Sequence, residues 1–307
     1  MQLTLDPLPP FDFDLSAQIF SNGDGRVQRY EDGVFSEIVR LSGAPALIRV
    51  SSQGTVDHPR LLVLVEVEAE DAFTEEDGEE GRADIEAVVV RLFNLNLDLL
   101  PFYEAVKSDR IMLQITRRLW GLHSPSTATV FEALVDSIIE QQISLKAAWS
   151  MQSRLIEAFG GALTLRGRTY FAYPKPENLA AATIEQLRSC GLSGRKAEYV
   201  QGVAKLVQDG LDLESFQSWS EEKIIEELSR IRGVGVWTAE MTMIRGMQKY
   251  DAFPGDDIGL RRIIAHYYYE GKKITGDEAR QTASAWSGWR GLASFYLVMA
   301  EQLKIVI

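Results

Sequence analysis

The segment LSRIRGVGVWTAEMTMIRG (228–246) constrains the fold more than any other part of the chain. One helix is predicted to end near Ile231, and a second to begin at about Val236. Gly233 and Gly235 allow a sharp turn between them and a close approach of the backbone to a ligand, because neither carries a Cβ. Taken alone, the two glycines favour a plain helix–turn–helix connection with a glycine C-cap.

The start of the second helix is predicted to attract an anion to this turn. Its first N–H groups have no partner within the helix, and the helix dipole is positive there, which suits a phosphate oxygen. Arg230 and Arg232 add positive charge beside it. Thr238 and Ala239 are small, so the second helix can pack close to the first. The full pattern, Leu-x-x-Ile-x-Gly-Val-Gly-x-x-Thr-Ala, therefore favours a phosphate-binding hairpin over a plain connection.

The chain from about residue 100 onward has helical periodicity. In FEALVDSIIEQQIS (131–144), apolar residues recur at the spacing of one buried helix face. Capping-box patterns, Thr183 with Gln186 and Ser218 with Glu221, predict two further helix starts. Other helices are expected at 196–207, 277–286 and 292–303.

The first third of the chain has the composition of β-structure. Three segments rich in Val, Ile and Leu predict strands at 46–51, 61–69 and 84–93. The charged stretch 70–84 is expected to be a solvated loop, with an acidic partner-binding patch as the weaker alternative. The predicted fold class is α+β, with an N-terminal antiparallel β domain (1–110) followed by a larger all-helical region (111–307).

The charge distribution keeps nucleic-acid binding open. The net charge is −12, but residues 1–110 hold 22 acidic and 9 basic side chains, whereas residues 111–307 hold 22 and 23. The acidity therefore belongs to the first third. The single cysteine, Cys190, excludes an internal disulfide and a four-thiolate Fe–S cluster. With no apolar run of membrane-spanning length and no secretory signal, we expect a cytoplasmic protein without membrane contact.

The hairpin and the segments around it resemble the helix–hairpin–helix (HhH-GPD) superfamily of base-excision DNA glycosylases. FPGDDIGLRRII (253–264) follows the hairpin and places Asp257 20 residues after Trp237. SIIEQQIS (137–144), the stretch 173–204 and WSGWRGLASFYLVMA (286–300) are similar to segments of 3-methyladenine DNA glycosylase II. The resemblance covers nearly the whole chain, and it implies that the N-terminal β domain is TBP-like.

The resemblance implies that Asp257 is the catalytic carboxylate. Breaking an N-glycosidic bond gives the sugar oxocarbenium-like charge, which a carboxylate can stabilise, or it can activate a water that captures the sugar. Asp256 is expected instead to cap the helix that begins IGLRRII. The plainer alternative is that both aspartates are only helix caps.

Trp237 stands where bifunctional members of the family have their lyase lysine, so the resemblance implies a monofunctional glycosylase. Its ring is expected either to stack on a flipped base, most favourably a cationic alkylated purine, or to pack in the core. Met241 stands where close relatives often have an aromatic residue, so the base pocket, formed by Trp237 and Met241, is expected to suit a different set of bases.

The remaining site residues follow from the family pattern. Gln142 matches the position that fills the gap left by a flipped base, although a mere surface glutamine also fits. DNA contacts are expected from Gln142 and from the hairpin residues Gly233, Gly235, Trp237 and Thr238. The resemblance also implies a monovalent cation, Na+ or K+, on the hairpin carbonyls of Ser229, Ile231 and Val234. The three histidines are scattered, so no zinc site is expected, and no cofactor is required.

Three functions are compatible with these residues. The first is a monofunctional glycosylase that removes damaged bases, above all alkylated purines, from double-stranded DNA and acts as a monomer. The second is a glycosylase for oxidised purines, against which the absent lysine argues. The third is a non-catalytic DNA-damage-binding protein, which the presence of Asp257 at the motif position disfavours.

Overall fold

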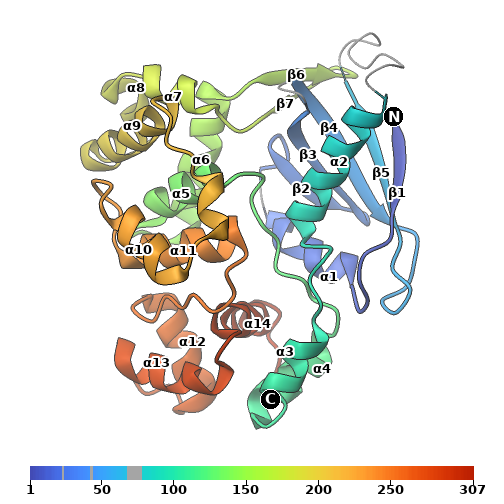
Figure 1. The fold of residues 1–307 in the computed structure, drawn as a ribbon, viewed down its shortest axis with the longest axis vertical. Helices are drawn as coiled ribbons and strands as arrows, with labels where there is room; N and C mark the ends of the chain where they lie inside the picture. Colours follow the sequence, from blue (N-terminus) through green and yellow to red (C-terminus); the bar gives the residue numbers. More distant parts are fainter. Residues whose placement is uncertain (23, 42–43, 68–77) are drawn as a thin grey trace.

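The computed structural model describes residues 1–22, 24–41, 44–67 and 78–307. An antiparallel sheet forms one side of the molecule, and helices form the rest (Figure 1). No helix in the described ranges combines the length and apolar character needed to cross a bilayer. The expected α+β architecture, with the sheet first and the helical region after it, is confirmed.

The sheet has the strand order β1-β5-β4-β3-β2, and every neighbouring pair is antiparallel. The predicted strands at 46–51 and 61–69 correspond to the fourth and fifth strands; residues 68 and 69 lie outside the described ranges. The short helices α1 (Phe13–Ala17) and η1 (Gln18–Asn22) follow β1. The strands are β1 (Gln2–Leu5), β2 (Gln28–Glu31), β3 (Val34–Leu41), β4 (Ala44–Ser52) and β5 (Leu61–Glu66).

The third predicted strand, 84–93, is wrong. This segment belongs to helix α2 (Gly78–Phe93), which packs on the sheet (Figure 1). Ile85, Val89 and Leu92 are all buried, and their spacing is that of one helix face. The run Ala-Val-Val-Val has strand propensity, but burial against the sheet overrides it. The predicted loop at 70–84 also changes, because residues 78–84 are helical and residues 70–77 lie outside the described ranges.

The helical region contains most of the expected helices with shifted ends. The helix predicted over 131–144 stops at Glu140, and the capping box at Thr183 is present. The capping box predicted at Ser218 is wrong: Ser220 caps the next helix by accepting from Lys223 N, while Ser218 ends a 3-10 turn. The elements before the hairpin are α3 (Leu100–Val106), α4 (Arg110–Arg118), α5 (Val130–Glu140), α6 (Leu145–Phe159), β6 (Ala162–Leu165), β7 (Arg168–Phe171), α7 (Pro176–Ala181), α8 (Ile184–Ser189), α9 (Gly194–Gln208) and η3 (Glu214–Ser218).

The hairpin and the C-terminal helices complete the chain. The elements are α10 (Glu221–Ser229), α11 (Val236–Met247), α12 (Ile258–Tyr268), α13 (Gly276–Ala283), η4 (Ser284–Trp286) and α14 (Arg290–Gln302). In Figure 1, α3 and α4 lie near the C-terminus and α14, although some 200 residues of sequence separate them.

Separate apolar cores underlie this arrangement. One core fills the sheet and α2, and a second fills the segment 130–252, which includes the hairpin. A third joins residues 99–122 to residues 250–300. The two-stranded sheet β6–β7 places Leu163 and Tyr170 against Ile38 and Leu47 of the large sheet. The helical region therefore also packs against the large sheet through β6 and β7. The segment with the hairpin is thus inserted within the chain that builds the third core.

Candidate functional site

The predicted hairpin is present, and its two glycines serve different purposes. Gly233 has φ +91°, and a Cβ there would lie 2.2 Å from the ring of Tyr199, so a side chain is excluded on both counts. Gly235 has φ −103°, and a Cβ there would meet nothing within 4 Å. Gly233 is therefore required by the fold, whereas the space beside Gly235 is open to an approaching ligand.

The N-terminus of α11 is open. Gly235 is its N-cap and supplies no side-chain hydrogen bond, and both Gly235 and Val236 are exposed. The first N–H groups of the helix are thus available to an outside acceptor, and the helix dipole favours an anion there. This is the arrangement expected of a phosphate-binding hairpin.

The two arginines beside the hairpin are not free charges. Arg230 pairs with Glu226 and Glu227 at 2.6 Å each, and Arg232 pairs with Glu198 at 2.8 Å. Their positive charge is therefore compensated by glutamates in the structure. The N-terminus of α11 is then the main group that can attract an anion. Exposed pairs of this kind are weak, and a phosphate can compete with them.

Asp257 begins α12 and is held by both of its oxygens. Oδ1 accepts the Leu260 backbone N–H at 2.7 Å, which makes Asp257 the N-cap. Oδ2 accepts the indole N–H of Trp237 at 3.1 Å. The side chain remains partly exposed. Since a carboxylate oxygen has two lone pairs, each oxygen can accept one further hydrogen bond.

Asp256 was expected to cap α12, and this prediction is wrong. Its side chain points to α13, where Oδ2 accepts from Arg280 Nη2 at 2.9 Å. Adjacent residues in a turn direct their side chains differently, and Asp257 has the extended backbone that an N-cap requires. The predicted catalytic residue and the cap are therefore one residue.

Trp237 lies at the first turn of α11, half-buried beside Asp257. Met241 follows one turn later and is also partly exposed. The hydrogen bond links the hairpin helix to the start of α12. The sequence placed Trp237 in the base pocket, but it contained no sign that the indole N–H meets the carboxylate, apart from the spacing of 20 residues.

Gln142 lies in the turn between α5 and α6. Its side chain is exposed, and its φ of +55° places it in the left-handed region. Its neighbour Gln141 turns the other way, and the amide nitrogen of Gln141 donates to the Gly233 carbonyl and to Thr238 Oγ1. The structure thus brings the predicted intercalating residue and the hairpin into one unit, and the role of Gln141 was missed by sequence reasoning.

The lysines nearest to the hairpin in sequence are engaged elsewhere. Lys249 Nζ donates to the Trp219 carbonyl at 3.0 Å, and Lys223 Nζ lies 3.7 Å from the centre of the Trp219 ring. Lys196 Nζ donates to the carbonyls of Ile139 and Gln141, and burial lowers the pKa of this amine.

The carbonyls expected to hold a cation lie at the end of α10 and in the hairpin turn. The Ile231 carbonyl accepts Val234 N–H at 3.0 Å. In the described part of the chain, no donor reaches the carbonyl of Ser229 or of Val234. Carbonyl oxygens with free lone pairs are the hard ligands that an alkali cation takes, so these residues fit such an ion. Among the described residues, no group of three or more His, Cys, Asp and Glu side chains is arranged to hold a metal.

A polar cavity lies beside α11, and its lining does not include Trp237 or Asp257. Glu240 faces it from α11, and Arg280 and Arg290 line it from α13 and α14. Burial raises the pKa of Glu240 to about 7, and Arg280 opposes the shift.

The fold and the hairpin geometry define a DNA-repair class. A model of the HhH-GPD superfamily of base excision DNA repair proteins matches residues 135–288, which include the hairpin and both aspartates. The chain belongs to this superfamily.

Particular relatives share much of the chain. DNA-3-methyladenine glycosylase of Bacillus subtilis (strain 168) is 33% identical over 70% of this chain and 72% of that protein. DNA-3-methyladenine glycosylase 2 of Escherichia coli (strain K12) is 28% identical over 59% of this chain and 61% of its own length. The 3-methyladenine DNA glycosylase from Archaeoglobus fulgidus has the same fold, with a TM-score of 0.84, 24% identity and coverage of 99% of this chain and 100% of that chain.

Proposed function

We propose that this protein is a monofunctional DNA glycosylase that removes alkylated bases from duplex DNA. The observation that carries the proposal is Asp257, a carboxylate bonded through both oxygens to two elements of the hairpin site and still partly open to solvent. Relatives named DNA-3-methyladenine glycosylase support the substrate class. A base-release assay over duplexes that carry alkylated or oxidised bases tests it.

Asp257 is proposed to act on the sugar of the flipped nucleotide. As the bond to the base breaks, positive charge develops on the sugar, and a fixed carboxylate beside it stabilises that charge without reorganising. The two N–H donors hold the carboxylate plane, and the free lone pairs remain for the sugar or for a water. The same carboxylate can orient the water that captures the sugar.

The product is proposed to be an intact abasic site. A lyase needs an unprotonated amine at the sugar, and Trp237 stands in the lysine position beside Asp257. Burial lowers the pKa of Lys196, but its amine is bound to two carbonyls at the end of α5. Borohydride added during turnover should trap no protein–DNA adduct, and later alkali should cleave the strand. A robust trapped adduct would overturn the monofunctional assignment.

DNA contact is proposed at the hairpin and at the turn after α5. The open N-terminus of α11 suits a backbone phosphate, and the exposed Gln142 suits the gap left by the flipped base. We propose that the carbonyls of Ser229, Ile231 and Val234 hold Na+ or K+, whose charge would strengthen phosphate binding. Replacing Na+ and K+ by tetramethylammonium at constant ionic strength should then weaken DNA binding.

The oxidised-purine alternative shares this fold. Solved neighbours include an 8-oxoguanine glycosylase/lyase of Clostridium acetobutylicum with a TM-score of 0.75 at 19% identity, which shows the fold alone. Trp237 in place of an amine is the residue that favours alkylated bases, because an indole face attracts a cationic ring. Faster release of 8-oxoguanine than of 3-methyladenine would reverse this choice.

A further inference from the structure

The side chain of Gln141, at the end of α5, bonds directly to the turn of the hairpin. Gln141 Nε2 donates to the Gly233 carbonyl at 2.8 Å and to Thr238 Oγ1 at 2.9 Å. Gly233 forms the hairpin turn and Thr238 lies buried in the first turn of α11. Both donor hydrogens of the amide are therefore used on the element that offers its N-terminus to a phosphate.

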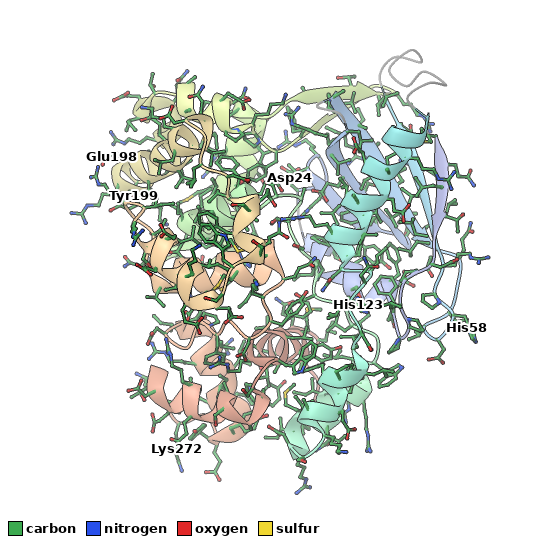
Figure 2. All side chains as sticks on the ribbon, viewed as in Figure 1. Asp24, His58, His123, Glu198, Tyr199 and Lys272 are labelled. Atoms are coloured by element: carbon green, nitrogen blue, oxygen red, sulfur yellow. The ribbon has the colours of Figure 1, made fainter. Side chains whose placement is uncertain are left out.

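A second tie comes from α9. Lys196 Nζ donates to the carbonyls of Ile139 and Gln141, both at 2.7 Å. These carbonyls lie at the C-terminus of a helix, where they lack partners within the helix and where a cation is favoured. Helix α9 also carries Tyr199 (Figure 2), and the ring of Tyr199 occupies the space where a Cβ on Gly233 would lie. The start of α9 thus supports both the α5 end and the hairpin turn.

These hydrogen bonds reach as far as Gln141, and the exposed side chain of Gln142 follows directly after it. Gln142 has φ +55°, and its side chain makes no hydrogen bond to any residue that the structure describes. A left-handed conformation is unfavourable for a residue other than glycine unless its surroundings impose it. The bonds of Gln141 and Lys196 supply such surroundings on the N-terminal side of Gln142.

We propose that Gln141 and Lys196 are positioning residues that fix Gln142 relative to the phosphate-binding hairpin. This inference rests on the proposed function. The hairpin sets where the DNA backbone lies, and the tied turn then sets where the intercalating side chain enters the duplex. The turn is already ordered when the protein has folded. Insertion of Gln142 into the duplex therefore does not have to meet the free-energy cost of ordering it when a base is extruded.

The proposal separates extrusion of the base from bond cleavage. Extrusion costs less when the damaged base is unpaired, so a defect in positioning Gln142 should matter mainly for a paired base. A defect in Asp257 or in the fold should instead lower base release from both substrates. The ratio of the two rates therefore reports the positioning role.

The test measures single-turnover release of 3-methyladenine from a paired site and from the same base in a one-nucleotide bulge. Gln141→Leu removes the donor and keeps the bulk, and it should slow the paired substrate roughly tenfold and the bulged one less than about twofold. Lys196→Met should act in the same sense. The matched control is Gln201→Leu, which removes an amide bond to the Ala182 carbonyl elsewhere on α9 and should leave the ratio unchanged.

A second measurement places the effect at Gln142. In a Gln142→Ala background, Gln141→Leu should cause little further loss on the paired substrate. Equal loss on both substrates, or full additivity with Gln142→Ala, would overturn the positioning role. If the wild-type chain released no base, the proposed function would fail instead. The positioning role would then still be decided by the fluorescence of 2-aminopurine beside an abasic analogue, which should rise less on binding to Gln141→Leu than to wild type.

Discussion

The two helices that frame the site, α11 and α12, begin in opposite ways. The first begins at Gly235, which provides no side-chain cap and leaves exposed N–H groups. The second begins at Asp257, whose Oδ1 takes the Leu260 N–H and whose Oδ2 takes the Trp237 indole N–H. The positive end of a helix is thus left open to an anion from outside in one case and occupied by the chain's own carboxylate in the other.

The comparison explains how one site can attract DNA and still present a negative group to the sugar. A phosphate and a carboxylate that used the same N–H donors would compete for them, and their negative charges would repel each other at short distance. Because each has its own helix end, the two negative charges are stabilised separately, and the indole of Trp237 links the two helices. Exchanging or removing the groups at the two ends should therefore change different steps.

The largest effect is expected from Asp257→Asn. Asparagine keeps the N-cap bond and the volume but loses the charge, so base release should fall by about a thousandfold or more. Binding to a duplex with an abasic analogue and the melting temperature should remain close to wild type, which serves as the control. Near-normal single-turnover release would remove Asp257 from the mechanism.

Gly235→Asp gives the uncapped N-terminus of α11 an aspartate like the one that caps α12. The open space at Gly235 admits the side chain, and an aspartate cap there should stabilise α11 while it repels a phosphate. DNA affinity should fall roughly tenfold or more, with an unchanged or higher melting temperature. Gly235→Asn is the matched neutral variant and should weaken binding less. Equal affinity of the Asp and Asn variants would show that no phosphate lies at this helix end.

Trp237→Phe tests the link between the two ends. It keeps a large aromatic ring but removes the N–H that reaches Asp257 Oδ2. Base release should fall about tenfold, the usual range for a lost bond to a charged group, while binding to an abasic duplex changes little. Trp219→Phe, in the stacked pair with Phe216, is the control. If the two variants release base equally fast, the indole bond does not orient the carboxylate.

The smallest effect concerns buried carboxyls, for which the cost of burial outweighs the hydrogen bonds that they accept. Glu37 on β3 has a buried, unpartnered Oε2, and burial raises the pKa of Glu37 to about 8; burial, with the charge of Glu37 second, does the same for Glu132 on α5. These acids hold protons more tightly in the folded than in the unfolded chain. The free energy of unfolding should therefore decrease as the pH rises from about 5 to about 8, and then level off.

Thermal melting between about pH 5 and about pH 9 measures this loss. Glu37→Gln removes one of these buried acids and should flatten the decline, whereas Glu104→Gln, at an exposed pair with Lys107, should not alter it. An identical decline in Glu37→Gln and in wild type would contradict the assignment to this carboxyl.

The parts of the site that the sequence predicts are those set by local geometry. Gly233 and Gly235 define the turn, and the interval to Asp257 places the carboxylate against α11. The choice between Asp256 and Asp257 as the cap was wrong because it depends on Arg280, which belongs to a helix more than 20 residues away in sequence. Such partners are fixed by tertiary packing and leave no local pattern.

The fold was predictable to a similar extent. Strand propensity is correct for β4, where alternate residues face the sheet core, but it fails for α2. The spacing of Ile85, Val89 and Leu92 was the available signal, and the local run of valines obscured it. The contact of Gln141 with the hairpin could not be predicted, because its partners Gly233 and Thr238 lie more than 90 residues away in sequence.

The insertion of the hairpin segment within another core affects how the chain is made. Helices α3 and α4 leave the ribosome early, yet Phe102, Met112 and Ile115 share their core with Tyr296 and Leu297 of α14. These apolar side chains stay uncovered until α14 has been synthesised, whereas the sheet and the 130–252 core can form before then. The third core therefore depends on α14, and a nascent chain halted before α14 would expose an apolar surface suited to a chaperone.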